Sequence, residues 1–333
     1  ENGLGWPDYN VEGEAPEMRG RSRYFLWGEP VEKKILLADV AEGKESLDAF
    51  MEQLSDEQLA DLLGGQPNTG VANTFGFGNL PEYGVPNAMT ADGPAGLRIA
   101  PHCGVCTTAW PCSTMLACTW NKEIVEEVGR AAASEVKENN ISFWLAPAVN
   151  IHRSPLCGRN FEYYSEDPFL AGKMAGNHGK GLEDHGVASC MKHIVANNCE
   201  SSRLRNDSII DERTLRELYL KVFEEAFTVY KPASLMTAYN GVNGVFCAEN
   251  GDMLQGIFEK EFGFDGFVMT DWTSSDTCDI VKAVDAGNGW ITPGGMEDTQ
   301  PMQIVKGVED GKIGRKRLEK SVYRMFRTVL KFS

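Results

Sequence analysis

Charged and aromatic residues that could take part in binding or chemistry occur where short apolar runs of the sequence end. They are Asp92, Arg159, Glu162, Lys192, His193, Tyr239, Asp271 and Trp272. Carboxylate and guanidinium groups can form paired hydrogen bonds with sugar hydroxyls. The face of an aromatic ring such as that of Trp272 packs against the C–H groups of a sugar ring. If these side chains meet in one place, their chemistry is that of a carbohydrate site.

Each of these residues also has a purely structural interpretation. A single aspartate after a strand often caps the next helix. Arg159 and Glu162 could form a surface ion pair of little energetic weight. Lys192 and His193 could be an exposed pair. Only the joint occurrence of these residues at the ends of successive apolar runs favours a shared site.

The apolar runs alternate with amphipathic segments and therefore predict strands that alternate with helices. The predicted strands are Phe143–Val149, Val187–Ile194, Ala233–Ala238 and Gly266–Thr270. Predicted helices begin at Asp167, Asp211 and Asn250, and a last one contains Leu318 and Leu330. This alternation predicts a parallel α/β sheet, either a closed barrel or an open doubly wound sheet. In both, functional residues gather at the carboxyl ends of the strands.

The first part of the chain has a different character. Residues 1–45 are rich in Gly, Pro and charges, and we interpret them as a linker or a wrapping arm. From Ser46 the apolar residues have helical spacing, and Ser55 and Gln58 form a capping box for a short helix that ends near Gly64. Residues 46–333 are therefore expected to form the main domain.

Composition limits the classes of partner. The chain has 333 residues, 42% of them hydrophobic, and a formal net charge of −16. Such an acidic surface disfavours nucleic acids and anionic membranes, and no apolar stretch is long enough for a transmembrane helix. The nine cysteines are an odd number and lie mostly in apolar runs, which favours reduced thiols in a cytoplasmic protein. The spacing after Cys103 and Cys106 is poor for zinc, and we predict no metal or cofactor.

Six groups of residues resemble glycoside hydrolase family 3, in the order in which that family has them. They are Ala91-Asp92-Gly93-Pro94; Trp110-Pro111 with Thr119-Trp120-Asn121; Gly158-Arg159-Asn160 with Glu162; Lys192-His193 with Asn197-Asn198; Met236 with Tyr239-Asn240; and Met269-Thr270-Asp271-Trp272 after Phe264-Asp265-Gly266-Phe267. The resemblance extends from about Ser46 to the last predicted helix, and it is to the β-glucosidase branch.

This resemblance implies a distorted or incomplete (β/α)8 barrel and a retaining hydrolysis of terminal β-glucosyl residues. Asp271 would be the nucleophile that forms a glycosyl-enzyme, and Tyr239 would orient it. The sugar would be bound by Asp92, Arg98, Arg159, Lys192, His193, Met236 and Trp272. We expect Arg159 and Lys192 to lower the pKa of Asp271 and so keep it ionised.

The chain departs from the family pattern in two places. Retaining hydrolysis needs a second carboxyl group, which this branch carries on a separate α/β sandwich domain. No such domain is recognisable in this sequence, so we expect it from the same precursor or from another chain, with Glu162, Glu200 and Asp207 as weaker candidates within this one. The second departure is the segment 288–295, where the family usually has an acidic turn and this chain has Trp290.

Three other interpretations remain open on the sequence. The enzyme could be a β-xylosidase or a broad exo-glycosidase. The domain could bind sugar without turning it over. An unrelated barrel such as an aldolase would need a Schiff-base lysine at a strand end, for which Lys192 is the candidate.

Overall fold

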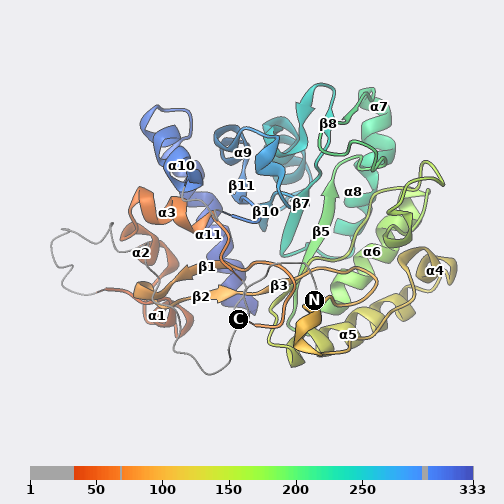
Figure 1. The fold of residues 1–333 in the computed structure, drawn as a ribbon, viewed down its shortest axis with the longest axis horizontal. Coiled ribbons are helices and arrows are strands. Elements are labelled where there is room, and N and C mark those ends of the chain that lie inside the picture. Colours follow the sequence, from red (N-terminus) through yellow and green to blue (C-terminus); the bar gives the residue numbers. More distant parts are fainter. Residues whose placement is uncertain (1–33, 68–69, 295–298, 333) are drawn as a thin grey trace, which may run out of the picture. The chain divides into compact units, whose positions relative to one another are not determined.

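The centre of the fold is a parallel sheet whose six strands lie side by side in the order of the chain (Figure 1). The structure is a computed structural model, and it describes residues 34–67, 70–294 and 299–332. The strands are β3 (Thr90–Ala91), β4 (Phe143–Trp144), β5 (Ala188–Ile194), β7 (Ser234–Thr237), β10 (Phe267–Met269) and β11 (Asn288–Trp290). Every neighbouring pair is parallel.

This strand order decides between the two sheet architectures left open by the sequence. A doubly wound sheet reverses its order at a switch point, whereas here each new strand adds to the same side. The sheet curls as in a barrel, and helices connect its strands on the outside (Figure 1). The predicted (β/α)8-type barrel is thus confirmed in a distorted, incomplete form.

The helices follow the strands as the alternating pattern predicts. Those of the main alternation are α5 (Lys122–Glu138), α6 (Pro168–Glu183), α8 (Lys221–Phe227), α9 (Ile280–Ala286), α10 (Thr299–Glu309) and α11 (Arg315–Phe332). Asp167 caps α6 by accepting hydrogen bonds from the backbone N–H groups of Phe169 and Leu170, and Pro168 occupies its first turn. Such local capping explains why the starts of these helices could be predicted from the sequence.

Two predicted helices are less regular than expected. The helix capped by Asp211 is divided into α7 (Glu212–Thr214), the π-helical η4 (Leu215–Tyr219) and α8. The segment after Asn250 is also π-helical, as η6 (Asp252–Glu261). In η4, the Leu220 N–H bonds to the Leu215 carbonyl, five residues back, so one extra residue is accommodated in the turn.

Among the described residues, no strand closes the barrel between β11 and β3. Here the chain forms an antiparallel hairpin, β1 (Phe77–Leu80) and β2 (Val85–Ala88), and an irregular segment before it. That segment pairs through Gly64 with Ile291 beyond β11, and the Thr74 hydroxyl bonds to the Thr90 carbonyl in β3. We call residues 63–67 and 70–76 the seam, since they connect the two edges of the sheet by isolated contacts.

A glycine is required where the seam meets the end of the sheet. A Cβ on Gly65 would lie 1.6 Å from the carbonyl oxygen of Pro293, so this backbone approach excludes any side chain. The predicted end of a helix at Gly64 is also observed: α3 (Asp56–Leu62) starts with the predicted capping box of Ser55 and Gln58.

The remaining elements surround this core. They are α1 (Leu37–Ala41), α2 (Leu47–Glu52), α4 (Ser113–Cys118), and a small sheet of β6 (Asp207–Ser208), β8 (Gly241–Val242) and β9 (Val245–Phe246). The helix α1 belongs to the compact unit that begins at Ile35. The rest of the predicted arm, residues 1–33, lies outside the described residues. No helix in the described ranges has the length and apolar character needed to cross a membrane.

A buried carboxylate joins the two central strands at the end of the barrel opposite to the strand carboxyl ends. Glu183, the last residue of α6, accepts hydrogen bonds from the Ser189 hydroxyl (2.7 Å) and the Ala233 N–H (2.6 Å). Burial raises the pKa of this carboxyl, and the two hydrogen bonds and Lys331 act in the opposite direction. Glu183 therefore holds the starts of β5 and β7 at a fixed spacing.

Replacing this residue should reveal how much the carboxylate contributes. Glu183→Ala leaves the buried Ala233 N–H without an acceptor, and we expect a loss of about 2 kcal/mol in the free energy of unfolding. Glu183→Gln keeps an acceptor oxygen and should lose clearly less. Urea unfolding followed by circular dichroism measures both, and equal stability of the alanine variant and the wild type would contradict this role.

Candidate functional site

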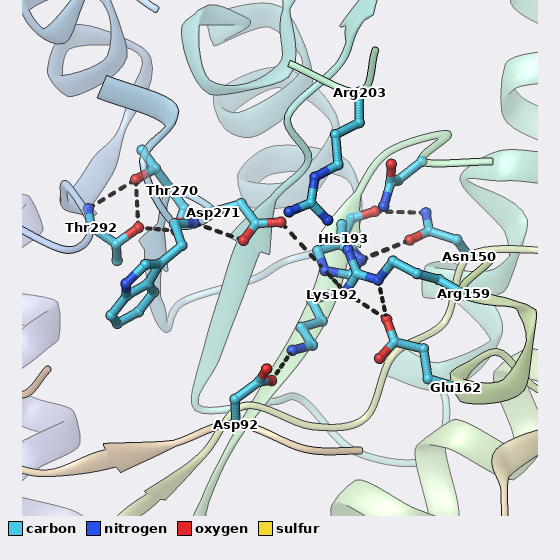
Figure 2. Close-up of polar contacts among 12 residues, drawn as sticks. Asp92, Asn150, Arg159, Glu162, Lys192, His193, Arg203, Thr270, Asp271 and Thr292 are labelled. Carbon is cyan, nitrogen blue, oxygen red and sulfur yellow. Dashed lines mark hydrogen bonds and ion pairs between the residues drawn. The ribbon is translucent and has the colours of Figure 1, made fainter. Parts of the chain in front are cut away.

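The polar residues predicted to meet do converge at the carboxyl ends of the strands (Figure 2). Asp92 follows β3, Lys192 and His193 lie near the end of β5, Tyr239 follows β7 and Asp271 follows β10. Since these strands are neighbours in one parallel sheet, their ends share one edge. The arrangement consists of a cluster around Asp92 and a cluster around Asp271, joined by the two consecutive residues of β5.

In the first cluster Asp92 is held between two cations. Its Oδ1 lies 2.6 Å from Nζ of Lys192, and its Oδ2 lies 2.9 Å from Nη1 of Arg98. Burial acts to raise the pKa of Asp92, but Lys192 and Arg98 outweigh it and lower this pKa to about 2. The side chain of Lys192 is only 3% exposed, so its ammonium depends on this partner. Arg98 therefore belongs to the cluster of Asp92.

An irregularity in β5 explains how Lys192 and His193 both reach the site. Side chains of a regular strand alternate between its two faces. Lys192 of β5 pairs with Met236 of β7, and Ile194 pairs with the next residue, Thr237. His193 is therefore an extra residue in β5 at this point. This bulge allows Lys192 to contact Asp92 while His193 contacts Arg159.

In the second cluster Arg159 is fixed by an acid and an imidazole. Its Nε donates to Oε1 of Glu162 (2.7 Å), and its Nη2 lies 2.8 Å from Nε2 of His193. Burial disfavours the charged guanidinium, but Tyr163, Glu162 and Asp271 together raise its pKa above the usual value. Arg159 is thus a fixed positive charge close to Asp271.

His193 is fully buried, and its environment keeps it neutral. Burial lowers the pKa of its imidazole well below the usual value, and the positive charges of Arg159, Lys192 and Arg203 lower it further. Asn150, which the sequence analysis did not single out, contacts the backbone and the ring of this histidine. His193 therefore does not form a true ion pair with Asp271, although its Nε2 lies 3.5 Å from Oδ2 of that residue.

Asp271 faces these residues with one carboxylate oxygen engaged and the other free. Its Oδ1 accepts the backbone N–H of Trp272 at 2.7 Å. Its Oδ2 has no donor in hydrogen-bonding geometry among the described residues. The residue as a whole is 7% exposed, which places it at the base of the strand ends rather than on an open surface.

Arg159 and Lys192 act to lower the pKa of Asp271, as expected, but they do not determine the direction of its net shift. Burial raises the pKa of Asp271 above its usual value, while Arg159 and Lys192 lower it, as do the Trp272 N–H and Tyr239. The sequence analysis named the two cations correctly and omitted burial, so its prediction of a lowered pKa was wrong. The cations limit a rise that burial would otherwise make larger.

Tyr239, Met236 and Trp272 complete the predicted set. The Tyr239 hydroxyl interacts with Asp271, and burial together with the charge of Asp271 raises the pKa of the phenol. Met236 is 2% exposed in β7, and Trp272 packs edge-on against Phe75 and Trp290 with its ring centre 6.4 and 5.8 Å from theirs. Met236 and Trp272 belong to the same apolar cluster.

Two site residues were missed by sequence reasoning. Arg203 places its guanidinium 4.6 Å from the ring centre of Tyr239 and pairs with Glu200 at 3.0 Å. Asn150 follows the predicted strand Phe143–Val149 directly, so its position at a strand end was a signal that could have identified it. Arg203 lies nine residues beyond β5 in an irregular loop, where no periodicity indicates its direction.

The carboxylates considered as internal acids all have other partners. Glu162 is buried against Arg159. Glu200 pairs with Arg203 and accepts a hydrogen bond from Asn197. Asp207 accepts the backbone N–H of Gly244. Each of these carboxylates therefore has a structural role in the described part of the chain.

The segment that departs from the family pattern contains a strand of the barrel. Its residues Asn288–Trp290 form β11, and the Trp290 side chain is fully buried. Beyond it, the hydroxyls of Thr292 and Thr270 lie 3.0 Å apart, which joins this segment to the strand end that carries Asp271. Residues 295–298 lie outside the described ranges.

The pairing of Lys192 with Asp92 bears on the aldolase alternative. Schiff-base chemistry requires a free amine. The Lys192 ammonium instead donates to Asp92 at 2.6 Å and is engaged in an ion pair. This contact favours a binding role for Lys192 over a nucleophilic one.

Comparison with known proteins gives one consistent result. The model of the glycosyl hydrolase family 3 N-terminal domain matches residues 80–328. Beta-glucosidase A of Butyrivibrio fibrisolvens is 51% identical over 309 residues, which are 92% of this chain and 36% of that protein. Thermostable beta-glucosidase B of Acetivibrio thermocellus is 42% identical over 256 residues, 74% of this chain and 34% of that protein.

Solved structures agree with the sequence comparison. Beta-glucosidase 3B of Thermotoga neapolitana, solved with glycerol, superposes with a TM-score of 0.81 at 41% identity, covering 86% of this chain and 43% of that one. The chain spans about a third of the length of the curated relatives described above. Both kinds of comparison confirm the family that six separate groups of residues indicated. The chain belongs to glycosyl hydrolase family 3 and contains the N-terminal domain of that family.

Proposed function

We propose that this chain supplies the nucleophile and most of the sugar-binding residues of a retaining exo-β-glucosidase. The observation that carries the proposal is Asp271: a carboxylate at a barrel strand end with one free oxygen, beside Arg159, Lys192 and Tyr239. The relatives and solved structures named above are β-glucosidases, which supports a terminal β-D-glucosyl residue as the group transferred.

The two clusters would bind different sides of one glucose ring. The Asp92 carboxylate, held by Lys192 and Arg98, would accept hydrogen bonds from hydroxyls at the far edge of the sugar. Lys192, Arg159 and His193 would bind ring hydroxyls between the clusters. Met236 and Trp272 would line the apolar side of the pocket.

The chemistry would follow a double displacement at the anomeric carbon. A carboxylate oxygen of Asp271 attacks that carbon while the glycosidic C–O bond breaks, and the departing oxygen takes a proton from an acid. Water then attacks the glycosyl-enzyme, gives its proton to the same acid's conjugate base, and releases Asp271. Tyr239 would orient the nucleophile through its contact with the carboxylate.

The acid would come from outside the described part of this chain. Its internal candidates Glu162 and Glu200 are each engaged in an ion pair with an arginine, which supports a structural role for both. We propose an α/β sandwich domain as its source, from the same precursor or from another chain. The relatives, about three times as long, leave ample length for such a domain.

We also propose a reducing, cytoplasmic environment. All nine cysteines lie in the described residues and none forms a disulfide there. Four of them, Cys157, Cys190, Cys247 and Cys278, are buried and act as small apolar side chains.

A fluorinated sugar tests the nucleophile even without the acid. A 2-deoxy-2-fluoro-β-glucoside with a dinitrophenolate leaving group needs no protonation to react, and its glycosyl-enzyme is slow to hydrolyse. We expect one sugar mass on the peptide that contains Asp271, measured by mass spectrometry after proteolysis. Asp271→Asn should lower the rate of labelling by on the order of 10³-fold or more.

The control for this experiment is Asp92→Asn, which weakens binding but leaves the nucleophile intact. It should still be labelled at Asp271 when the reagent concentration is raised. Tight, reversible binding of the reagent without a covalent adduct would contradict the enzyme and favour a sugar-binding domain.

The pH dependence of labelling tests the electrostatics of Asp271. Only the ionised carboxylate attacks, so the rate falls as pH drops through its pKa. Burial raises this pKa and Lys192 lowers it, with burial the larger effect. The acidic limb of the pH profile, where the labelling rate falls as the pH drops, should therefore have its midpoint above the ordinary aspartate pKa in the wild type. Removing the charge in Lys192→Met should move the limb to still higher pH.

Arg98→Met is the matched control, because Arg98 contacts Asp92 and is not among the groups that shift the pKa of Asp271. It should weaken binding and leave the acidic limb in place. A limb that stays unchanged in Lys192→Met would show that another group titrates.

The source of the acid is tested by the leaving group. In this chain alone, the rate of glycosylation should fall steeply from dinitrophenyl to nitrophenyl glucoside, because a poorer leaving group needs the proton whose transfer contributes about 10²- to 10⁴-fold. A flat dependence would mean that the chain contains its own acid. Glu200→Gln and Asp207→Asn would then show which carboxyl it is, since only the true acid makes the dependence steep when removed.

A further inference from the structure

Two backbone groups of His193 determine how the Asn150 amide is oriented. The Nδ2 atom of Asn150 lies 2.8 Å from the His193 carbonyl oxygen, and its Oδ1 lies 3.1 Å from the His193 N–H nitrogen. A backbone carbonyl only accepts and a backbone N–H only donates. If the Asn150 amide were flipped, its oxygen would face the His193 carbonyl oxygen and its NH₂ group would face the His193 N–H. The amide oxygen is therefore on the N–H side.

This orientation determines the protonation of one ring nitrogen. Nδ1 of His193 also lies 3.1 Å from Oδ1 of Asn150, an atom that can only accept. Nδ1 must consequently carry the proton and donate it. The Tyr163 hydroxyl, 3.5 Å from Nδ1, accepts from Asn197 and is compatible with a second, longer contact from the same N–H.

The other ring nitrogen is determined independently by Arg159. Its Nη2 lies 2.8 Å from Nε2 of His193, and a guanidinium has only donors. Nε2 must therefore be an unprotonated acceptor. Both contacts specify the same state: a neutral imidazole with its proton on Nδ1. Burial and the charges of Arg159, Lys192 and Arg203 oppose a second proton and support this state.

The tautomer matters because Nε2 is also the ring nitrogen nearest to Asp271. It lies 3.5 Å from Oδ2 of Asp271, the carboxylate oxygen that has no donor among the described residues (Figure 2). If the proton were on Nε2, the imidazole would donate to this oxygen and stabilise its charge. A hydrogen bond to the charged form makes a carboxylate a weaker nucleophile.

We propose that Asn150 is a positioning residue that helps to hold His193 in the Nδ1–H tautomer and thereby keeps the imidazole from donating a hydrogen bond that would weaken the Asp271 carboxylate as a nucleophile. The tautomer follows from the contacts alone, whereas its importance for attack rests on the proposed function. Asn150 is 2% exposed and reaches the reaction only through the histidine.

The first test reads the tautomer directly in the full chain. Two-bond ¹⁵N–¹H correlation spectra of protein with ¹⁵N-labelled histidine separate protonated from unprotonated ring nitrogens. The chain has five histidines, and His193→Gln identifies the signals of this one. We expect a protonated Nδ1 and an unprotonated Nε2 throughout pH 5 to 8, a range of ~3 units that spans the ordinary histidine pKa. A protonated Nε2 in the wild type would overturn the proposal.

The second test removes the amide. In Asn150→Ala, Nδ1 loses its acceptor and the Tyr163 hydroxyl can donate to it, so that Arg159 alone of these two contacts still opposes a proton on Nε2. We expect the ¹⁵N signals to show a mixture of the two tautomers, and labelling of Asp271 by the dinitrophenyl fluoro-glucoside to slow by about two- to tenfold. The new hydrogen bond lowers the pKa of Asp271, so the acidic limb should move to lower pH although the rate is smaller.

A slower rate combined with an acidic limb at lower pH distinguishes a tautomer effect from a general disordering of the site. Disordering would slow labelling without moving the acidic limb to lower pH. The other groups that act on Asp271, namely Arg159, Lys192, Tyr239 and the Trp272 N–H, are unchanged in the variant. Asn177→Ala is the matched control, since Asn177 is a buried asparagine of α6 whose amide bonds to the Lys173 carbonyl. It should leave both the rate and the limb unchanged.

The outcomes distinguish the two proposals. Slower labelling of Asn150→Ala with the Nδ1–H tautomer retained would overturn the role of Asn150. Absence of any labelling in the wild type would contradict the proposed nucleophile, while the wild-type spectra would still decide the tautomer. If Asn150→Ala does not fold, those spectra remain the deciding measurement.

Discussion

The site depends on keeping a nearly buried carboxylate charged. Desolvation of Asp271 favours its neutral form, and the positive charges of Arg159 and Lys192 oppose that effect. Neither cation could be buried alone, because an isolated charge in the interior is costly. Glu162 therefore accompanies Arg159, and Asp92 accompanies Lys192. The polar residues of the site form one balanced set of charges around the carboxylate that we propose as the nucleophile.

The backbone serves this balance as much as the side chains do. The irregular pairing of β5 brings two consecutive residues into the same site, one for each cluster. Asn150 then uses the backbone of His193 as a reference for the direction of its own amide. The His193 peptide groups, whose donor and acceptor roles are fixed, orient the Asn150 amide. The amide in turn determines which nitrogen of the imidazole carries the proton. This order defines one ring nitrogen of His193, and the Arg159 guanidinium defines the other.

Much of the site was predictable because parallel strands bring their carboxyl ends together. Asp92, Arg159, His193 and Asp271 were assigned to one place from their positions after apolar runs. The sign of the pKa shift of Asp271 was not predictable, since burial depends on how closely the surrounding loops pack. In the fold, β3 and β11 were missed because two or three residues are too few to show a period. Loop residues such as Arg203 have no periodicity to reveal their direction.

The incomplete barrel has a mechanical consequence for binding. The sheet ends at β3 on one side and at β11 on the other, and only the isolated contacts of the seam connect them. Asp92 follows one edge strand, and Asp271 follows the strand beside the other edge. In the proposed reaction, a glucose ring in contact with both carboxylates would connect the two edges of the sheet non-covalently. It would thereby add to the isolated contacts of the seam, which connect these edges among the described residues.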